Sequence, residues 1–148
     1  MFREKRDYGI IFAVVIVSLI LVAAFLMLGG EGSRKEISIE ETTFAKKQLS
    51  PGDNTTLRIR LKNESSDSRA KDVVVWLEPS AMDSISVDEE LIEVGSVGSK
   101  AVRIVSFIVS IEEGTLEGTY EILVKTSADS PFSGDEEQVF LDVGGGSS

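Results

Sequence analysis

The chain has 148 residues, a formal net charge of -10 and a sequence pI of about 4.5. It contains neither cysteine nor histidine, which excludes disulfides and zinc–thiolate sites and removes the commonest general base. The acidic balance argues against a nucleic-acid partner, because such proteins carry a basic face. We therefore expect a small non-enzymatic domain, with no catalytic residue, no cofactor and no metal site.

The chain begins with a short basic tail at 1–7, followed by an apolar run at 8–28. Positions 9–28 hold no charged residue and no proline. In a helix, about 20 residues rise about 30 Å, which is the thickness of the hydrocarbon core of a bilayer. The run therefore predicts one N-terminal transmembrane helix. Because it carries no charge, we interpret it as a tether and not as an ion or proton path.

The orientation of this helix is predicted from the basic residues at its ends. Arg3, Lys5 and Arg6 precede the run, and Arg34 and Lys35 follow it. The larger number on the N-terminal side predicts a cytoplasmic N-terminus and an extracytoplasmic C-terminal domain. The expected localisation is the cell membrane, as a single-pass protein.

Two other interpretations of the N-terminus stay open. A cleaved secretory signal has an apolar region of about 7 to 15 residues, which is shorter than this run, and Gly30-Glu31-Gly32 is a poor cleavage site. A pilin-type signal is suggested by the order of charged residues, Gly9 and then the apolar run. In a pilin-type signal, however, the glycine lies closer to the basic pair than Gly9 lies to Lys5 and Arg6.

After a glycine- and serine-rich linker at 29–35, apolar residues alternate with polar ones, which is the pattern of half-buried strands. The expected strands are 36–44, 55–62, 73–77, 84–88, 91–97, 101–111, 119–125 and 138–143. Seven or eight short strands over about 110 residues predict an all-β, immunoglobulin-like antiparallel β-sandwich at 36–143. The sequence GGGSS at 144–148 is expected to be a flexible tail.

Three of these segments carry more specific expectations. Residues 73–77 are apolar on both faces, which predicts a central strand covered on both sides, with Trp76 packed in the core. The apolar phase of 101–111 changes between Ile104 and Val105, which predicts a β-bulge. Tyr120 is interpreted either as a core residue or as a corner tyrosine whose hydroxyl holds a loop.

Four short segments follow one another in a recognisable order: the Pro51-Gly52 turn, TTLRIRLKN at 55–63, DVVVWLEP at 72–79, and Gly118-Thr119-Tyr120. In this order they resemble the CARDB-like and S-layer-associated immunoglobulin-like domains of archaeal and bacterial cell-surface proteins. The resemblance covers about 37–143. It implies the same sandwich and a role in adhesion, scaffolding or protein interaction without catalysis, and it supplies no binding residue. Those domains often have a glycine after the asparagine, where this chain has Glu64.

Two groups of residues are candidate sites. Asn54 and Asn63 begin N-x-[ST] sequons at strand–loop junctions, where a glycan would stay in solvent, and we expect glycosylation at both. Arg58, Arg60 and Lys62 share one face of the strand at 55–62. They are interpreted either as an outer face paired with nearby acids or as a docking stripe for an acidic partner or a surface glycan.

Acidic clusters occur at 88–90, 112–113 and 135–137. Carboxylates are conceivable calcium ligands, but no cluster has the spacing of an EF-hand loop. We interpret the clusters as solvated charge that keeps the surface soluble.

The sequence therefore favours a membrane-anchored, non-catalytic surface protein whose immunoglobulin-like domain binds a protein partner, as an adhesion, scaffold or accessory subunit. One alternative is an archaellum or pilus accessory protein, which also combines an N-terminal span with a β-sandwich. A second alternative is a carbohydrate-binding module, which requires an exposed aromatic side chain. The expected burial of Trp76 and Tyr120 counts against that module.

Overall fold

The structure, a computed structural model, describes residues 33–144. The predicted cytoplasmic tail at 1–7 and transmembrane helix at 8–28 lie outside the described residues, as do most of the linker at 29–35 and the tail after Gly144. Between residues 33 and 144 there is no helix of the length and apolarity that a membrane span requires. This part of the chain consists of strands, turns and loops.

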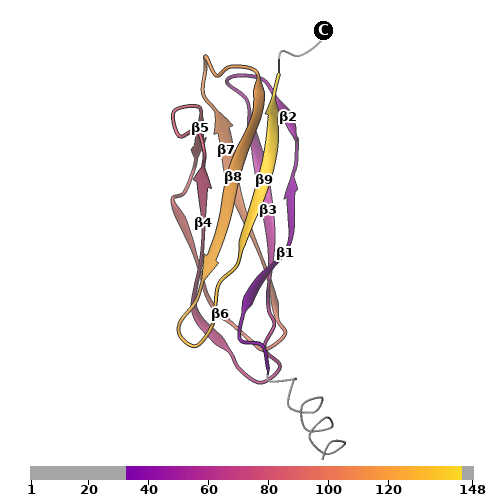
Figure 1. Cartoon of the computed structure of the whole chain (residues 1–148), viewed down its shortest axis with the longest axis vertical. Coiled ribbons are helices and arrows are strands. Elements are labelled where there is room, and N and C mark those ends of the chain that lie inside the picture. Colours follow the sequence, from indigo (N-terminus) through magenta and orange to yellow (C-terminus); the bar gives the residue numbers. More distant parts are fainter. Residues whose placement is uncertain (1–32, 145–148) are drawn as a thin grey trace, which may run out of the picture. The chain divides into compact units, whose positions relative to one another are not determined.

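Nine strands form two facing sheets within the described residues (Figure 1). They are β1 (Ile37–Phe44), β2 (Gln48–Leu49), β3 (Asn54–Asn63), β4 (Ala70–Pro79), β5 (Ile85–Val87), β6 (Leu91–Val97), β7 (Val102–Ile111), β8 (Gly118–Ser127) and β9 (Glu136–Val143). One sheet has the order β1-β3-β7-β5 and the other the order β2-β9-β8-β4-β6. The first order corresponds to strands ABED of immunoglobulin domains, and β9-β8-β4 corresponds to GFC. The predicted all-β, immunoglobulin-like sandwich is confirmed, but the described residues form nine strands where seven or eight were predicted, and the pair β2–β9 is parallel where the prediction was antiparallel.

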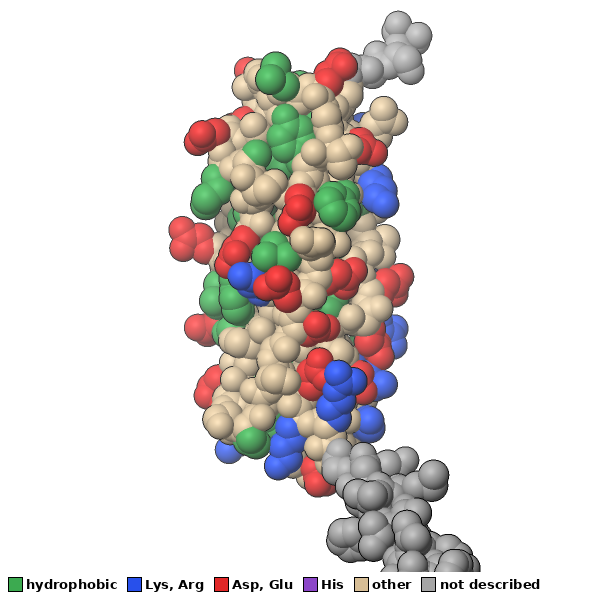
Figure 2. Space-filling model, viewed as in Figure 1, with side chains coloured by type: hydrophobic (Ala, Val, Ile, Leu, Met, Phe, Trp, Pro, Cys, Tyr) green, Lys and Arg blue, Asp and Glu red, His purple; other side chains and the backbone are tan. Residues whose placement is uncertain are grey.

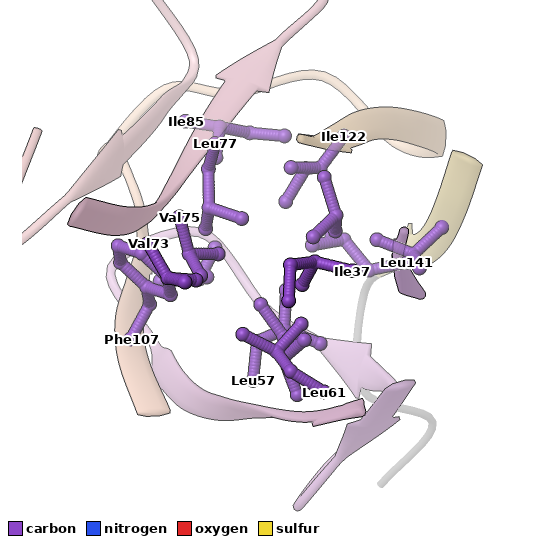
Figure 3. Packing of buried hydrophobic residues seen from close by; sticks show 14 of the residues in the cluster. Ile37, Leu57, Leu61, Val73, Val75, Leu77, Ile85, Phe107, Ile122 and Leu141 are labelled. Atoms are coloured by element: carbon purple, nitrogen blue, oxygen red, sulfur yellow. The ribbon is translucent and has the colours of Figure 1, made fainter. Parts of the chain in front are cut away.

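The alternating sequence of β3 places one face of this strand in the core. Leu57, Ile59 and Leu61 are fully buried, whereas Arg58 and Arg60 between them are exposed. Buried side chains of β4, β8 and β9 in the other sheet face those of β3, and those of β7 lie beside them on the same sheet (Figure 3). Each fully buried aliphatic side chain stabilises the fold by about 1.5–3 kcal/mol relative to an exposed one.

The turn before β3 forms as its residue types predict. The Asp53 amide donates to the carbonyl oxygen of Ser50 (3.0 Å), and Gly52 has a φ of +86°, which suits the third position of a type II turn after proline. The Ser50 amide donates in return to Asp53 Oδ2 at 3.0 Å. This hydrogen bond, with a smaller effect of Lys46, lowers the pKa of the Asp53 carboxyl.

The first strand of the sandwich divides between the two sheets. β1 pairs with β3, whereas β2, which starts four residues after Phe44, pairs in parallel with the end of β9. The alternating pattern of the sequence does not predict β2, because two residues are too few to show it. This change of sheet limits how far the first strand covers β9.

The predicted β-bulge in β7 is wrong. β7 pairs with β3 without interruption, from Asn54 opposite Ser110 to Lys62 opposite Val102. The second apolar phase has another cause, because Ile104 and Ile108 point outward and are 47% and 46% exposed. In the sequence, apolar residues on the outward face produce the same change of apolar phase as a β-bulge.

The prediction that β4 is covered on both sides, with Trp76 in the core, is also wrong. Val73, Val75 and Leu77 face the core, and the strand period of two therefore places Trp76 on the opposite face. There Trp76 is half-buried, and its indole N–H donates to Glu78 Oε1 at 2.9 Å. The apolar outer face of β4 is a surface feature.

Candidate interaction surfaces

The free edge of β9 exposes backbone groups that are available for strand pairing. The amides of Asp142 and Gly144 donate to the carbonyl oxygens of Lys47 and Leu49, at 3.0 and 2.9 Å, so they point away from β8. By alternation, Gln138 and Phe140 point to the same side. Along residues 33–144, no chain segment pairs with the backbone of Gln138 or Phe140 on that side. Four hydrogen-bonding groups, two per residue, therefore face outward.

A groove of about 350 Å³ runs beside this edge. Its apolar lining comes from Phe44, Val139 and Phe140, and its polar lining includes Thr42 and Lys47. Val139 is nearly buried, Phe44 is half-buried, and Phe140 is 47% exposed. The edge therefore combines unpaired backbone groups with an apolar wall.

The other sheet edges of the sandwich carry features that hinder strand addition. β1 has a register shift between Ile39 and Glu41, and β5 is only three residues long. The pairing of β6 with β4 is interrupted on both sides of Val73, and Gly95 within β6 has a φ of +80°. Bulges, shortness and irregularity are the devices by which natural edges avoid pairing. By contrast, β9 pairs with β8 in an unbroken register over its whole length.

The predicted docking stripe lies on the outer face of β3 as expected, but most of its charge is paired. Arg60 Nε lies 2.8 Å from Glu40 Oε2. Lys62 Nζ lies 3.5 Å from Glu40 Oε1 and 3.6 Å from Glu64 Oε2. These contacts favour the interpretation of an ordinary outer face. Arg58 lines a shallow pocket together with Glu41, Thr43 and Ile104, and it forms no ion pair with any described residue.

Glu64 joins the end of β3 to β1. Its Oε1 accepts a hydrogen bond of 2.7 Å from the Ser38 hydroxyl, and Lys62 and Lys100 lie near its other oxygen, at 3.6 and 3.8 Å. The hydroxyl, followed by the two ammonium groups, lowers the pKa of the Glu64 carboxyl, while partial burial acts in the opposite direction.

The two sequons differ sharply in exposure. Asn54 is exposed at the start of β3, so its glycosylation stays a prediction. Asn63 is fully buried; its Nδ2 donates to the carbonyl oxygens of Ser68 (2.9 Å) and Val97 (3.0 Å), and its Oδ1 accepts from the Ser65 amide at 2.9 Å. The expectation that Asn63 offers its amide to a glycan in solvent is therefore wrong for the folded domain. Asn63 is a structural residue that holds the loop after β3.

The acidic clusters serve local hydrogen bonds. Asp88 Oδ1 accepts from the Ile108 amide, and Glu112 Oε1 accepts from the Ser86 hydroxyl. Asp135 Oδ2 accepts from the Ile39 amide and Glu137 Oε1 from the Thr42 hydroxyl, at 2.8 and 2.9 Å, so these two carboxylates connect β9 and the loop before it with β1. Among the described residues, no three acidic side chains are grouped as a metal site would require.

A polar network surrounds Trp76 on the outer face of the five-stranded sheet. Lys125 lies opposite Trp76 across the β4–β8 pair, and its Nζ is 3.1 Å from Glu78 Oε2 and 3.5 Å from Glu136 Oε2. The Trp76 indole and then Lys125 lower the pKa of Glu78, and Glu78 in turn raises the pKa of Lys125. Figure 2 shows hydrophobic side chains interspersed with acidic and basic ones on the visible face.

Tyr120 has the geometry of a corner tyrosine. It lies near the start of β8, and its hydroxyl donates to the carbonyl oxygen of Leu116 at 2.7 Å. β8 occupies the position of strand F, where immunoglobulin-like domains place this residue. Of the two interpretations of Tyr120, the corner tyrosine is the one observed.

The free edge of β9 cannot be identified from the sequence alone. The sequence predicts a strand at 138–143, and the last strand of a sandwich is an edge strand in this topology. Whether the edge is covered depends on where β1 ends and how long β2 is, and neither follows from the alternating pattern of β9.

Comparison with known proteins identifies the fold and nothing finer. No protein-family model matches the chain, and no curated protein matches it in sequence. The solved structures that are similar include the E. coli alpha-2-macroglobulin, with a TM-score of 0.55 and 16% identity over 70% of this chain. A FixG-related protein from Vibrio parahaemolyticus has a TM-score of 0.52 and 12% identity over 72% of this chain. The sporulation control protein Spo0M from Bacillus subtilis has a TM-score of 0.51 and 13% identity over 76% of this chain.

These similarities cover very different shares of the other proteins. The matched region is 6% of the macroglobulin, 49% of Spo0M and 95% of the FixG-related protein. At such identities the likeness shows a shared fold and carries no activity or partner to this chain.

Proposed function

We propose that this chain is a single-pass membrane protein whose immunoglobulin-like domain is held outside the cytoplasm and acts as a non-catalytic protein-interaction module. Adhesion, scaffolding and service as an accessory subunit of a membrane complex all belong to this role. The resemblance to CARDB-like and S-layer-associated domains supports the proposal. The uncharged run at 9–28 supports the anchor.

The observation that carries the interaction role is the free edge of β9. A strand edge with unpaired N–H and C=O groups is a template for another chain, and soluble domains usually protect such edges. In this sandwich the other edges are short or irregular, whereas β9 is regular and its free part, Gln138–Leu141, is bordered by an apolar groove. Strand addition is an established mode of peptide recognition.

A membrane-extraction experiment tests the anchor and its orientation. We expect the full chain to stay in the membrane pellet after alkaline extraction, and external protease to reach the sandwich in intact spheroplasts. The matched variant Val17→Arg places a charge in the middle of the apolar run. On insertion scales this charge costs about 2.5–3.5 kcal/mol. We therefore expect part of the variant protein to be released from the membrane. A wild-type chain found in the soluble fraction, or a protease-protected sandwich, would contradict the proposal.

A second candidate function, glycan binding, is favoured by the outward position of Trp76. A shallow site of about 420 Å³ is lined by Trp76, Lys125, Asp135 and Glu136, which combines an aromatic ring with charged hydrogen-bonding groups. Aromatic rings beside polar groups suit sugar recognition. Glycan-array binding that disappears in Trp76→Ala and persists in Ile108→Ala would favour this function over the first.

A further inference from the structure

We infer that the free edge of β9 binds an extended segment of a partner protein in which two adjacent apolar residues are flanked by basic ones, and that the segment adds to the five-stranded sheet as a strand. This inference deepens the proposed interaction role and depends on it only in taking the partner to be a protein.

The available slot has defined ends. At one end the Thr42 hydroxyl donates to Glu137 Oε1 at 2.9 Å, so β1 lies against β9 there. At the other end β2 pairs with Asp142 and Val143. Between them lie Gln138–Leu141, which span about 13 Å at about 3.3 Å per residue. Because β2 is already paired to this edge, the incoming segment would extend an existing ladder.

The groove determines which side chains of the segment are apolar. A side chain opposite Val139 points inward, toward Phe44 and the gap between the sheets, where an aliphatic group removes apolar surface from water. A side chain opposite Phe140 points outward and packs across the strands against an aromatic ring that is 47% exposed. Apolar residues therefore suit both positions.

The charge of β9 determines which side chains suit the remaining positions of the segment. The sequence of β9, EEQVFLDV, holds three acidic residues and no basic one. Glu136 and Asp142 are on the outer face beyond either end of the slot, and both are exposed. Lysine or arginine flanking the apolar core of the segment would meet complementary charge, which increases the association rate and selects against acidic segments.

The same charges disfavour a second copy of this chain as the occupant. An antiparallel β9–β9 pair centred on Val139 would place Glu136 of each copy opposite Asp142 of the other. Like charges directly opposite each other destabilise strand pairs. In addition, β2 already occupies the edge at Asp142.

The test uses the full chain in mild detergent and fluorescently labelled peptides of about eight residues. The parent peptide has two adjacent valines flanked by lysines, a second has glutamate in place of lysine, and a third is the parent methylated on alternate backbone nitrogens. We expect the parent to bind with a micromolar dissociation constant, and each of the other two to bind at least tenfold more weakly. A methylated or acidic peptide that binds as tightly as the parent, or a parent that fails to bind, would overturn the inference.

Variants of the chain locate the site. Gln138→Pro removes an N–H that points to the free edge and leaves the ladder with β8 intact, so we expect parent binding to weaken at least tenfold. Phe140→Ala should weaken it several-fold, whereas the control Ile108→Ala removes an equally exposed apolar side chain from the other sheet and should change nothing. Equal losses in Phe140→Ala and Ile108→Ala would overturn the inference, and this pair decides even if the proline variant does not fold.

Sedimentation of the full chain distinguishes the two sources of a strand. We expect no dimer that depends on the edge. A dimer that is lost in Gln138→Pro would assign the edge to a second copy and overturn the inference. The outcome of the membrane extraction is independent, because peptide binding requires only the sandwich and the anchor requires only the apolar run.

Discussion

At the residue scale, Asn63 shows how one buried amide can hold a loop. All its hydrogen-bonding partners are backbone groups, of Ser65, Ser68 and Val97, so the side chain connects the end of β3 with β6 and with the loop between β3 and β4. A buried polar group is tolerated only when it is hydrogen-bonded. Here the requirement is met completely, because no buried side-chain nitrogen or oxygen lacks a partner in the described part of the chain.

We predict that Asn63→Ala destabilises the domain by about 2–3 kcal/mol, because it leaves buried backbone groups without partners. The matched control is Asn54→Ala, which changes the other sequon at an exposed position and should alter stability by less than about 0.5 kcal/mol. Chemical denaturation of both variants checks this prediction. Equal stabilities would show that the Asn63 side chain does not hold the loop.

The acid sensitivity of the fold should depend in part on Glu64. Its pKa is lowered in the folded state, mainly by the Ser38 hydroxyl, from an ordinary value of 4.5. A carboxyl with a lowered pKa stabilises the fold above its unfolded pKa, and this contribution is lost as the pH falls through the folded pKa. We therefore predict that stability decreases as the pH falls below about 4.5.

The variant Glu64→Gln removes this titration, so the stability of the variant should decrease less steeply on acidification than that of the wild type. Thermal melts at several pH values between neutral and acidic conditions measure the difference. Parallel pH profiles would contradict the role of Glu64. Ser86→Ala, which removes the hydroxyl that donates to Glu112, is the control for the loss of a hydroxyl–carboxylate hydrogen bond elsewhere on the surface.

At the element scale, β7 and β3 differ in the direction in which their apolar side chains point. Every apolar residue of β3 is inward and buried, whereas β7 places Ile104 and Ile108 outward. The sequence shows that both segments are strands. It does not show which apolar phase faces the core when both phases are apolar, because that depends on the register with the neighbouring strand.

We predict that Ile59→Ala costs about 2–5 kcal/mol, because it removes fully buried methyl groups and leaves a cavity. Ile104→Ala, on the neighbouring strand and 47% exposed, should cost less than about 1 kcal/mol. Denaturant unfolding of the two variants compares an inward with an outward isoleucine. Comparable losses would mean that Ile104 packs in the core and that the register of β7 is different.

At the scale of the whole molecule, alternation alone was sufficient to predict the fold class and the approximate bounds of eight strands. It did not reveal β2, the outward position of Trp76 or the burial of Asn63. The reason is common to all three, since each depends on contacts between segments distant in the sequence. Asn63, for example, is buried because Val97 of β6 lies beside it.

The free edge of β9 also belongs to this scale, because it results from how the whole first strand is divided. The basic and acidic residues of 1–33 are equal in number, so the net charge of -10 resides in the remainder of the chain. An acidic domain with one regular open edge would select basic extended partners and resist association with itself.

Amide hydrogen exchange along β9 measures whether the edge of this strand is free. The amides of Val139 and Leu141 point toward β8, and that of Asp142 donates to Lys47, so all three should be protected. If the edge is free, the amides of Gln138 and Phe140 should exchange at least about a hundredfold faster than these neighbours in the isolated full chain. Uniform protection of residues 138–142 would contradict the account, because it would mean that the edge of β9 is already paired.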